Sequence, residues 1–95
     1  MDDDSVKDKY QIASEKLKAL ANSLRLKIIV GLIENECSVT EMQRKLGVPQ
    51  STLSQHLRVL RDKGIIEGRR EGAKICYKVV DKCVIQIVEC LLQIF

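Results

Sequence analysis

The stretch from Leu46 to Leu60 constrains the fold most, because it predicts a turn followed by a helix with two unlike faces. Leu53, Leu57 and Leu60 recur at spacings of four and three, so they lie on one helical stripe that must face a core. The opposite face carries mostly uncharged hydrogen-bonding side chains: Gln50, Ser51, Thr52, Ser54, Gln55 and Arg58. Such a face suits a helix that lies in the major groove of DNA and contacts base edges. An ordinary solvated face is the alternative, although residues 50–57 contain neither Glu nor Lys.

A shorter helix is predicted directly before this one. Ser38 and Glu41 fit the capping-box pattern S-x-x-E, and Gly47 is well placed to end the helix in a left-handed conformation. Pro49 suits the first turn of the next helix, where its missing N–H costs nothing. Two helices joined by a tight turn that contains glycine predict a helix-turn-helix over residues 38–63.

A β-hairpin is predicted over residues 65–80, where the hydrophobic period changes to two. Ile75, Tyr77 and Val79 alternate on one face, and residues 71–73 form the turn. Three basic residues lie near the tip: Arg69, Arg70 and Lys74. A basic hairpin after a polar-faced helix is typical of the wing of a winged helix, which contacts the DNA backbone or the minor groove. A solvated hairpin tip is the alternative.

Positive charge is concentrated in the same part of the chain. Residues 38–80 carry a net charge of +5, whereas residues 1–37 and residues 81–95 each carry −1. Phosphate-binding proteins have such a basic footprint, although extra Lys and Arg can also simply aid solubility. The alternative to a DNA-binding regulator is a protein-interaction module on a winged-helix scaffold, with no inducer and inert cysteines; the concentrated positive charge and the polar helix face argue against it. We expect no enzyme, because the chain has one His and lacks a Ser/His/Asp grouping, a phosphate-binding glycine loop and paired carboxylates in a plausible cleft.

Helices are predicted at both ends of the chain, over residues 5–20 and 81–95. The first has apolar residues at helical spacing: Val6, Tyr10, Ala13, Leu17 and Leu20. The last, which Asp81 can cap, is apolar nearly all round, with Val84, Val88, Leu91 and Phe95 on one stripe. Its β-branched residues leave a strand as the alternative. A 95-residue monomer has too little protein to bury this helix, so we expect a homodimer through both end helices.

Together these segments predict a single domain over residues 1–95. The domain is mainly α with a small β-hairpin (α+β). Asn22 can cap a further helix, which follows the first one and is buried. No apolar run is long enough to span a membrane and no signal peptide begins the chain, so we expect a soluble, cytoplasmic protein.

The chain resembles the ArsR/SmtB family of bacterial winged-helix repressors over roughly residues 15–80. The similar segments are residues 17–29 (LKALANSLRLKII), 38–42 (SVTEM), 50–60 (QSTLSQHLRVL), 63–66 (KGII) and 69–72 (RREG), continuing to Tyr77. The resemblance implies four helices, a two-stranded wing and a fifth helix, in a homodimer that represses transcription until an inducer releases it. The implied partner is double-stranded DNA with an imperfect palindromic operator.

The resemblance also implies roles for single residues. The polar residues listed above for positions 50–58 look like the family's major-groove readers. His56 stands where the family often has His, and it either contacts a DNA phosphate or braces the helix. Pro49 replaces the small polar residue that is more usual there.

The four cysteines leave three alternatives open. They are inert packing groups, or they sense oxidants or reactive sulfur, or they bind a thiophilic metal or arsenite. The candidate sensing residues are Cys37, Cys83 and Cys90, whereas Cys76 lies on the other face of the wing. Cys83 and Cys90 are separated by about 10.5 Å along one helix, which is too far for a disulfide within it. A bond between Cys90 and Cys37, or across the dimer axis, remains open.

The standard zinc sites of the family are not expected here. Its metal sensors often carry a Cys-x-Cys pair where this chain has Ser38 and Thr40, or Asp and His pairs on the last helix, where this chain has no His. We therefore predict no cofactor other than the thiophilic metal or arsenite that the cysteines leave open.

Overall fold

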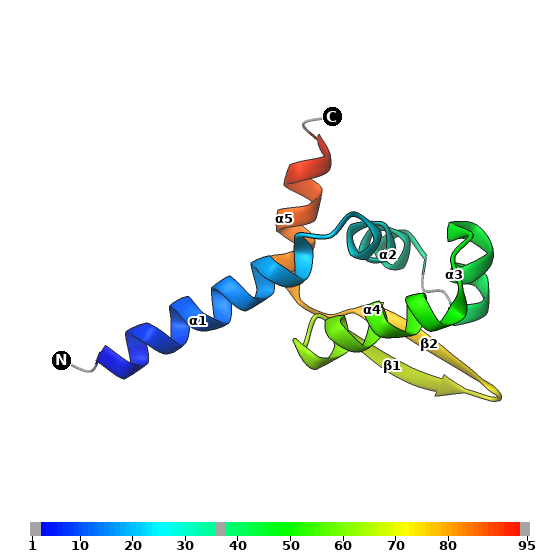
Figure 1. Ribbon diagram of the computed structural model, residues 1–95, viewed down its shortest axis with the longest axis horizontal. Coiled ribbons are helices and arrows are strands. Elements are labelled where there is room, and N and C mark those ends of the chain that lie inside the picture. The colour runs from blue at the N-terminus through cyan, green and yellow to red at the C-terminus, as the bar shows by residue number, and fades with distance from the viewer. Residues whose placement is uncertain (1–2, 36–37, 94–95) are drawn as a thin grey trace.

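The computed structural model describes residues 3–35 and 38–93. The elements follow the predicted order: α1 (Asp3–Leu20), α2 (Ser23–Glu34), α3 (Val39–Leu46), α4 (Gln50–Asp62), β1 (Ile66–Glu71), β2 (Lys74–Val79) and α5 (Lys82–Gln93). Figure 1 shows α2, α3 and α4 gathered beside the hairpin, with α1 and α5 extending away in different directions. The last segment is a helix, so the alternative of a strand is wrong.

Local signals set the helix boundaries largely as predicted. The Oδ1 atom of Asn22 accepts the backbone N–H of Arg25 at 3.0 Å, which caps α2. Ser38 and Glu41 form the reciprocal capping box of α3, and Gly47 ends that helix at a φ of 66°. Two details differ: α1 already begins at Asp3, and Pro49 is the N-cap of α4 instead of lying in its first turn.

The core lies between α2, α4, the base of the hairpin and α5. Leu53, Leu57 and Leu60 are all buried, as their spacing predicts. The strands contribute Ile66, Tyr77 and Val79, and α5 contributes Val84 and Val88. This packing fixes the orientation of α4 with its polar face outward.

The hairpin pairs antiparallel, with Gly68 opposite Tyr77 and Arg69 opposite Cys76. A Cβ atom at position 68 would lie 3.1 Å from the side chains of both Ile75 and Tyr77, so any larger residue there would crowd these two side chains. The alternation predicts that Ile75 faces inward with Tyr77, but Ile75 is 40% exposed, so this prediction is wrong. It lies near the hairpin tip, beyond the reach of the helices that cover Tyr77 and Val79.

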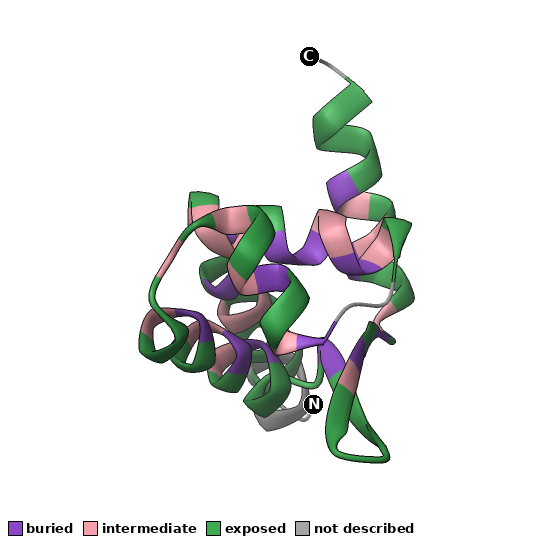
Figure 2. Cartoon of the chain, turned by 90° about the vertical axis from the view of Figure 1, so that its right-hand side faces the viewer, coloured by how far each residue is buried: buried purple, intermediate pink, exposed green. Residues whose placement is uncertain are grey.

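The two end helices keep large apolar surfaces open. The radius of gyration is 14.5 Å, against about 12 Å for a compact domain of this length, because α1 projects as an arm (Figure 1). Tyr10, Ile12 and Leu17 on that arm are more than half exposed. Figure 2 shows that the C-terminal part of α5 is also exposed, including Leu91 and Leu92.

Candidate nucleic-acid interface

The predicted reading face of α4 is open to solvent. Its exposed side chains are those of Gln50, Ser51, Ser54, Gln55 and Arg58, whereas Thr52 is half-buried at the edge of this face. Several of them line a hollow of about 510 Å³ between α4 and the base of the wing, whose floor includes Val39, Leu57 and Tyr77. The face therefore presents hydroxyl, amide and guanidinium groups beside a concave surface.

Arg61 belongs to the same surface and was not among the predicted residues. It is exposed and lines the hollow together with Ser54 and Arg58. Its position three residues after Arg58 places both guanidinium groups on one side of the helix. This spacing is the signal in the sequence that identifies Arg61.

The three basic residues of the wing lie exposed, as predicted, but Arg69 has an acidic partner. Its Nε and Nη2 atoms donate to Oε2 of Glu71 at 3.0 and 2.6 Å. The thiol of Cys76 donates to Oε1 of the same carboxylate at 3.2 Å. The hydrogen bond from Cys76, followed by those from Arg69, lowers the pKa of Glu71. One of the three wing cations is thus held beside a carboxylate, whereas Arg70 and Lys74 add exposed positive charge.

The half-buried ring of His56 lies on the flank of α4 that faces α2. Its Nδ1 atom is 3.1 Å from Nη1 of Arg25, a residue of α2 that is 31 positions away in the sequence. Burial lowers the pKa of His56, and the positive charge of Arg25 lowers it further. This contact is compatible with the brace that was one of the two expected roles of His56, and both roles stay predictions. Arg25 was not a predicted site residue, because no local pattern relates it to His56.

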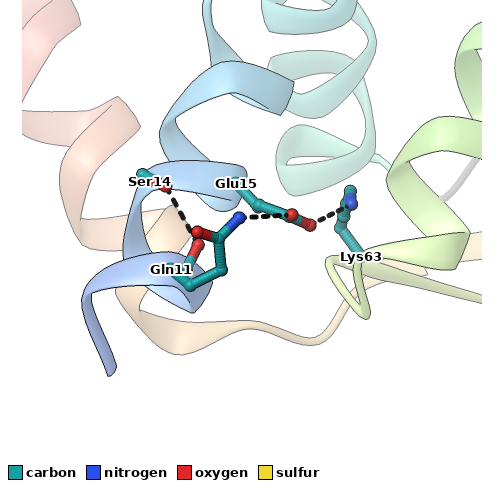
Figure 3. Close-up of polar contacts among 4 residues, drawn as sticks. All are labelled: Gln11, Ser14, Glu15 and Lys63. Carbon is teal, nitrogen blue, oxygen red and sulfur yellow. Dashed lines mark hydrogen bonds and ion pairs between the residues drawn. The ribbon is translucent and has the colours of Figure 1, made fainter. Parts of the chain in front are cut away.

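Polar contacts also join α1 to this region. Lys63, which follows α4, forms an ion pair with Glu15 of α1, and within α1 Gln11 donates to the same carboxylate at 2.9 Å (Figure 3). Arg25 also donates to the carbonyl oxygens of Lys18 and Ala19, in the last turn of α1. The helix that presents the polar face is therefore linked by polar contacts to the projecting arm.

The predicted sensing cysteines do not form one cluster in the described part of the chain. Cys83 and Cys90 are exposed on α5, Cys76 is half-buried in the wing, and Cys37 lies outside the described residues. Within residues 3–35 and 38–93, no group of three or more His, Cys, Asp or Glu side chains is placed to hold a metal ion. Over the same residues, no helix has the length and hydropathy needed to cross a membrane.

Comparison with known proteins identifies the family. Residues 22–67, which include α2, α3 and α4, match the family described as bacterial regulatory protein, arsR family. The chain is 42% identical over 79 residues to the biofilm growth-associated repressor of Xylella fastidiosa, a match that covers 83% of this chain and 69% of that protein. These are regulatory proteins, which agrees with the expectation that the chain is not an enzyme.

Solved structures agree over nearly the whole fold. Reduced HlyU from Vibrio cholerae superposes with a TM-score of 0.87 at 35% identity, over 96% of both chains. The homodimeric winged helix-turn-helix DNA-binding domain Mb0332 from Mycobacterium bovis superposes with a TM-score of 0.85 at 30% identity, over 96% of this chain and 83% of that one. The chain therefore belongs to the ArsR family of winged helix-turn-helix DNA-binding transcriptional regulators.

Proposed function

We propose that this protein is a homodimeric repressor that binds an imperfect palindromic operator and is released when an inducer reacts at its cysteines. One observation carries the proposal: the exposed face of α4 has hydrogen-bonding side chains beside a basic wing, within a segment of net charge +5. Residues that read bases need hydrogen-bonding groups, whereas those that bind phosphates need positive charge.

The two surfaces divide the contacts to DNA. Gln50, Ser51, Ser54, Gln55 and Arg58 enter the major groove, with Thr52 at its edge, and Arg61 extends the same surface. Arg69, Arg70 and Lys74 of the wing contact the backbone or the adjacent minor groove. The contacts of the wing contribute similarly to binding of all DNA sequences, so the choice of operator depends on α4.

The exposed apolar surfaces of α1 and α5 support the dimer. A folded monomer leaves Tyr10, Ile12, Leu17, Leu91 and Leu92 in water, and pairing of the end helices between two copies would bury them. The similar Mycobacterium bovis domain is described as homodimeric. A two-fold dimer presents two copies of α4, which matches a palindrome with half-sites about one helical turn apart.

The position of the cysteines on α5 supports a thiol-based release step. Cys83 and Cys90 are exposed on a proposed dimer helix, so oxidation or metal binding there would alter how the two copies pack. A thiol sensor also suits a protein of the cytoplasm, where cysteines stay reduced until challenged. A similar structure is described as reduced HlyU, which is a further reason to test the thiols. Inert thiols are the alternative.

The test is operator binding by the purified chain, first reduced and then treated separately with diamide, polysulfide, arsenite or zinc. The operator is selected from random DNA, and binding is followed by fluorescence anisotropy. We expect one treatment to weaken binding at least tenfold, and Ser substitution of Cys37, Cys83 or Cys90 to abolish that effect. Cys76→Ser is the matched control and should respond as the parent does. A variant without cysteines that responds like the parent would refute thiol sensing. A reporter gene linked to the operator tests repression, which should be lost when the inducing treatment is applied.

A further inference from the structure

We propose that Arg25 is a positioning residue for DNA binding: it holds His56 as the tautomer protonated on Nε2, so that this N–H can donate to a DNA phosphate. The inference rests on the proposed contact between α4 and DNA. It assigns a function to Arg25, which belongs to neither the polar reading face nor the wing, and it joins the two roles expected of His56 in one arrangement.

The chemistry of the contact fixes the tautomer. Nη1 of Arg25 lies 3.1 Å from Nδ1 of His56. A guanidinium group can only donate hydrogen bonds, so Nδ1 must offer its lone pair. The ring proton of neutral His56 is then on Nε2, at the opposite edge of the ring. Protonation of both nitrogens would remove the acceptor and place a second positive charge beside Arg25.

Arg25 is itself fixed on two sides, so it can orient a neighbour. Its Nε atom donates to the carbonyl of Ala19 at 2.6 Å, and Nη2 donates to that of Lys18 at 3.3 Å. Both carbonyls belong to the last turn of α1, where few carbonyls have partners within the helix, although that of Lys18 also accepts the backbone N–H of Ala21 at 3.2 Å. Each of the three guanidinium nitrogens thus makes one contact, and together they join α1 and α2 to α4.

The place of His56 on α4 makes a phosphate its natural partner. A helix in the major groove has a phosphate backbone on each side, so residues that flank the reading face lie closest to phosphates. His56 and Thr52 are four residues apart on one flank, and both are half-buried, whereas the reading face is exposed. A neutral N–H donor there fixes the position of the helix without adding charge.

The first experiment observes the tautomer directly. His56 is the only His in the chain, so long-range ¹H–¹⁵N correlations of the ¹⁵N-labelled protein at pH 7.5 report on this ring alone. We expect the Nε2–H tautomer in the parent and in Lys27→Met, an exposed control on α2, but a mixture of tautomers in Arg25→Met. An Nδ1–H tautomer in the parent, or a parent-like spectrum in Arg25→Met, would overturn the proposal.

The second experiment separates the brace from the phosphate contact. In His56→Asn the amide stands near Nδ1 and can still accept from Arg25, whereas in His56→Gln it reaches toward Nε2. We expect His56→Asn to keep the parent's melting temperature yet bind the operator roughly tenfold more weakly. His56→Gln should melt lower but bind within about threefold of the parent.

The salt dependence of operator affinity, measured for the parent and the His56 variants, shows whether the lost contact is neutral or charged. Loss of a neutral donor should leave the slope of log K against log salt unchanged, whereas loss of a charged contact would reduce it by about 0.9. Equal losses of affinity in both His56 variants, or a reduced slope, would overturn the role of Nε2–H. Failure of the parent to bind DNA would instead refute the proposed function, while the tautomer measurement would still test the Arg25 contact.

Discussion

Lys16 of α1 lies 2.6 Å from the carboxylate of Asp81, whose side chain is only 9% exposed. The other oxygen of Asp81 accepts the backbone N–H of Val84 at 3.1 Å, which caps α5. One carboxylate therefore joins the two helices that carry the exposed apolar surfaces. Burial opposes its ionisation, but the hydrogen bonds from Lys16 and Val84 outweigh burial and lower its pKa.

Asp81→Ala should reduce the free energy of unfolding by about 1–2 kcal/mol, because it removes both the cap and the ion pair. Asp81→Asn keeps an acceptor for the cap, so its effect should be smaller. Urea denaturation followed by circular dichroism gives both values, with Asp8→Asn on the exposed side of α1 as the control. Equal effects of Asn and Ala would show that the cap contributes nothing.

Acidification should destabilise the protein through His56. Its pKa in the folded state lies below the ordinary value of 6.5, so the unfolded chain takes up a proton first as the pH falls. The stability contributed by neutral His56 is therefore complete above pH 6.5 and is lost as the pH falls toward the folded pKa. Arg25 is the charged group that faces the ring, and Glu15, Lys18 and Lys63 line the adjacent hollow.

Urea unfolding at pH 7.5 and pH 5.5 measures this effect. The parent should lose more stability between these pH values than His56→Asn, which has no titrating ring. If the variant loses as much as the parent, His56 does not titrate with a lowered pKa.

The carboxylate of Glu71 should weaken DNA binding, because it lies beside Arg69 on the surface that we propose contacts phosphates. Glu71→Gln should therefore raise affinity roughly threefold at low salt, for operator and random DNA alike. Glu67→Gln, on the same strand and also exposed, controls for the general loss of a negative charge. An unchanged affinity in Glu71→Gln would mean that the wing tip does not approach DNA.

Arg58→Ala and Arg70→Ala should have different effects on DNA binding. Loss of a base contact from Arg58 should cost about 1–3 kcal/mol on the operator and relax its sequence preference. Arg70→Ala should weaken binding to all sequences similarly and lower the salt slope by about 1. Titrations with operator and scrambled DNA at several salt concentrations distinguish them, and matching behaviour of the two variants would contradict the division between helix and wing.

Much of the fold was predictable because its signals are local. Asn22, Ser38 with Glu41, and Gly47 act within four residues of the helix ends that they define. The leucine stripe of α4 identifies its buried face directly, and the polar reading face is the complement of that stripe.

The remaining features join segments that are far apart in the chain. Arg25 and His56 are 31 residues apart and Glu15 and Lys63 are 48 apart, so no periodicity relates them. The exposure of Ile75 depends on how far the hairpin extends beyond the helices, which alternation alone does not specify. An isolated β-bridge between Ser38 and Cys76 also joins residues far apart in the chain, without any signal in the sequence.

Methylation interference on the selected operator tests the central claim most directly, because methylation of guanine N7 blocks the major groove, whereas methylation of adenine N3 blocks the minor groove. We predict two clusters of interfering guanines about 10 base pairs apart, where the two copies of α4 enter the groove, and loss of part of each cluster in Arg58→Ala. Binding that tolerates methylation at every guanine N7, or clusters that Arg58→Ala leaves unchanged, would contradict recognition of DNA by the polar face of α4.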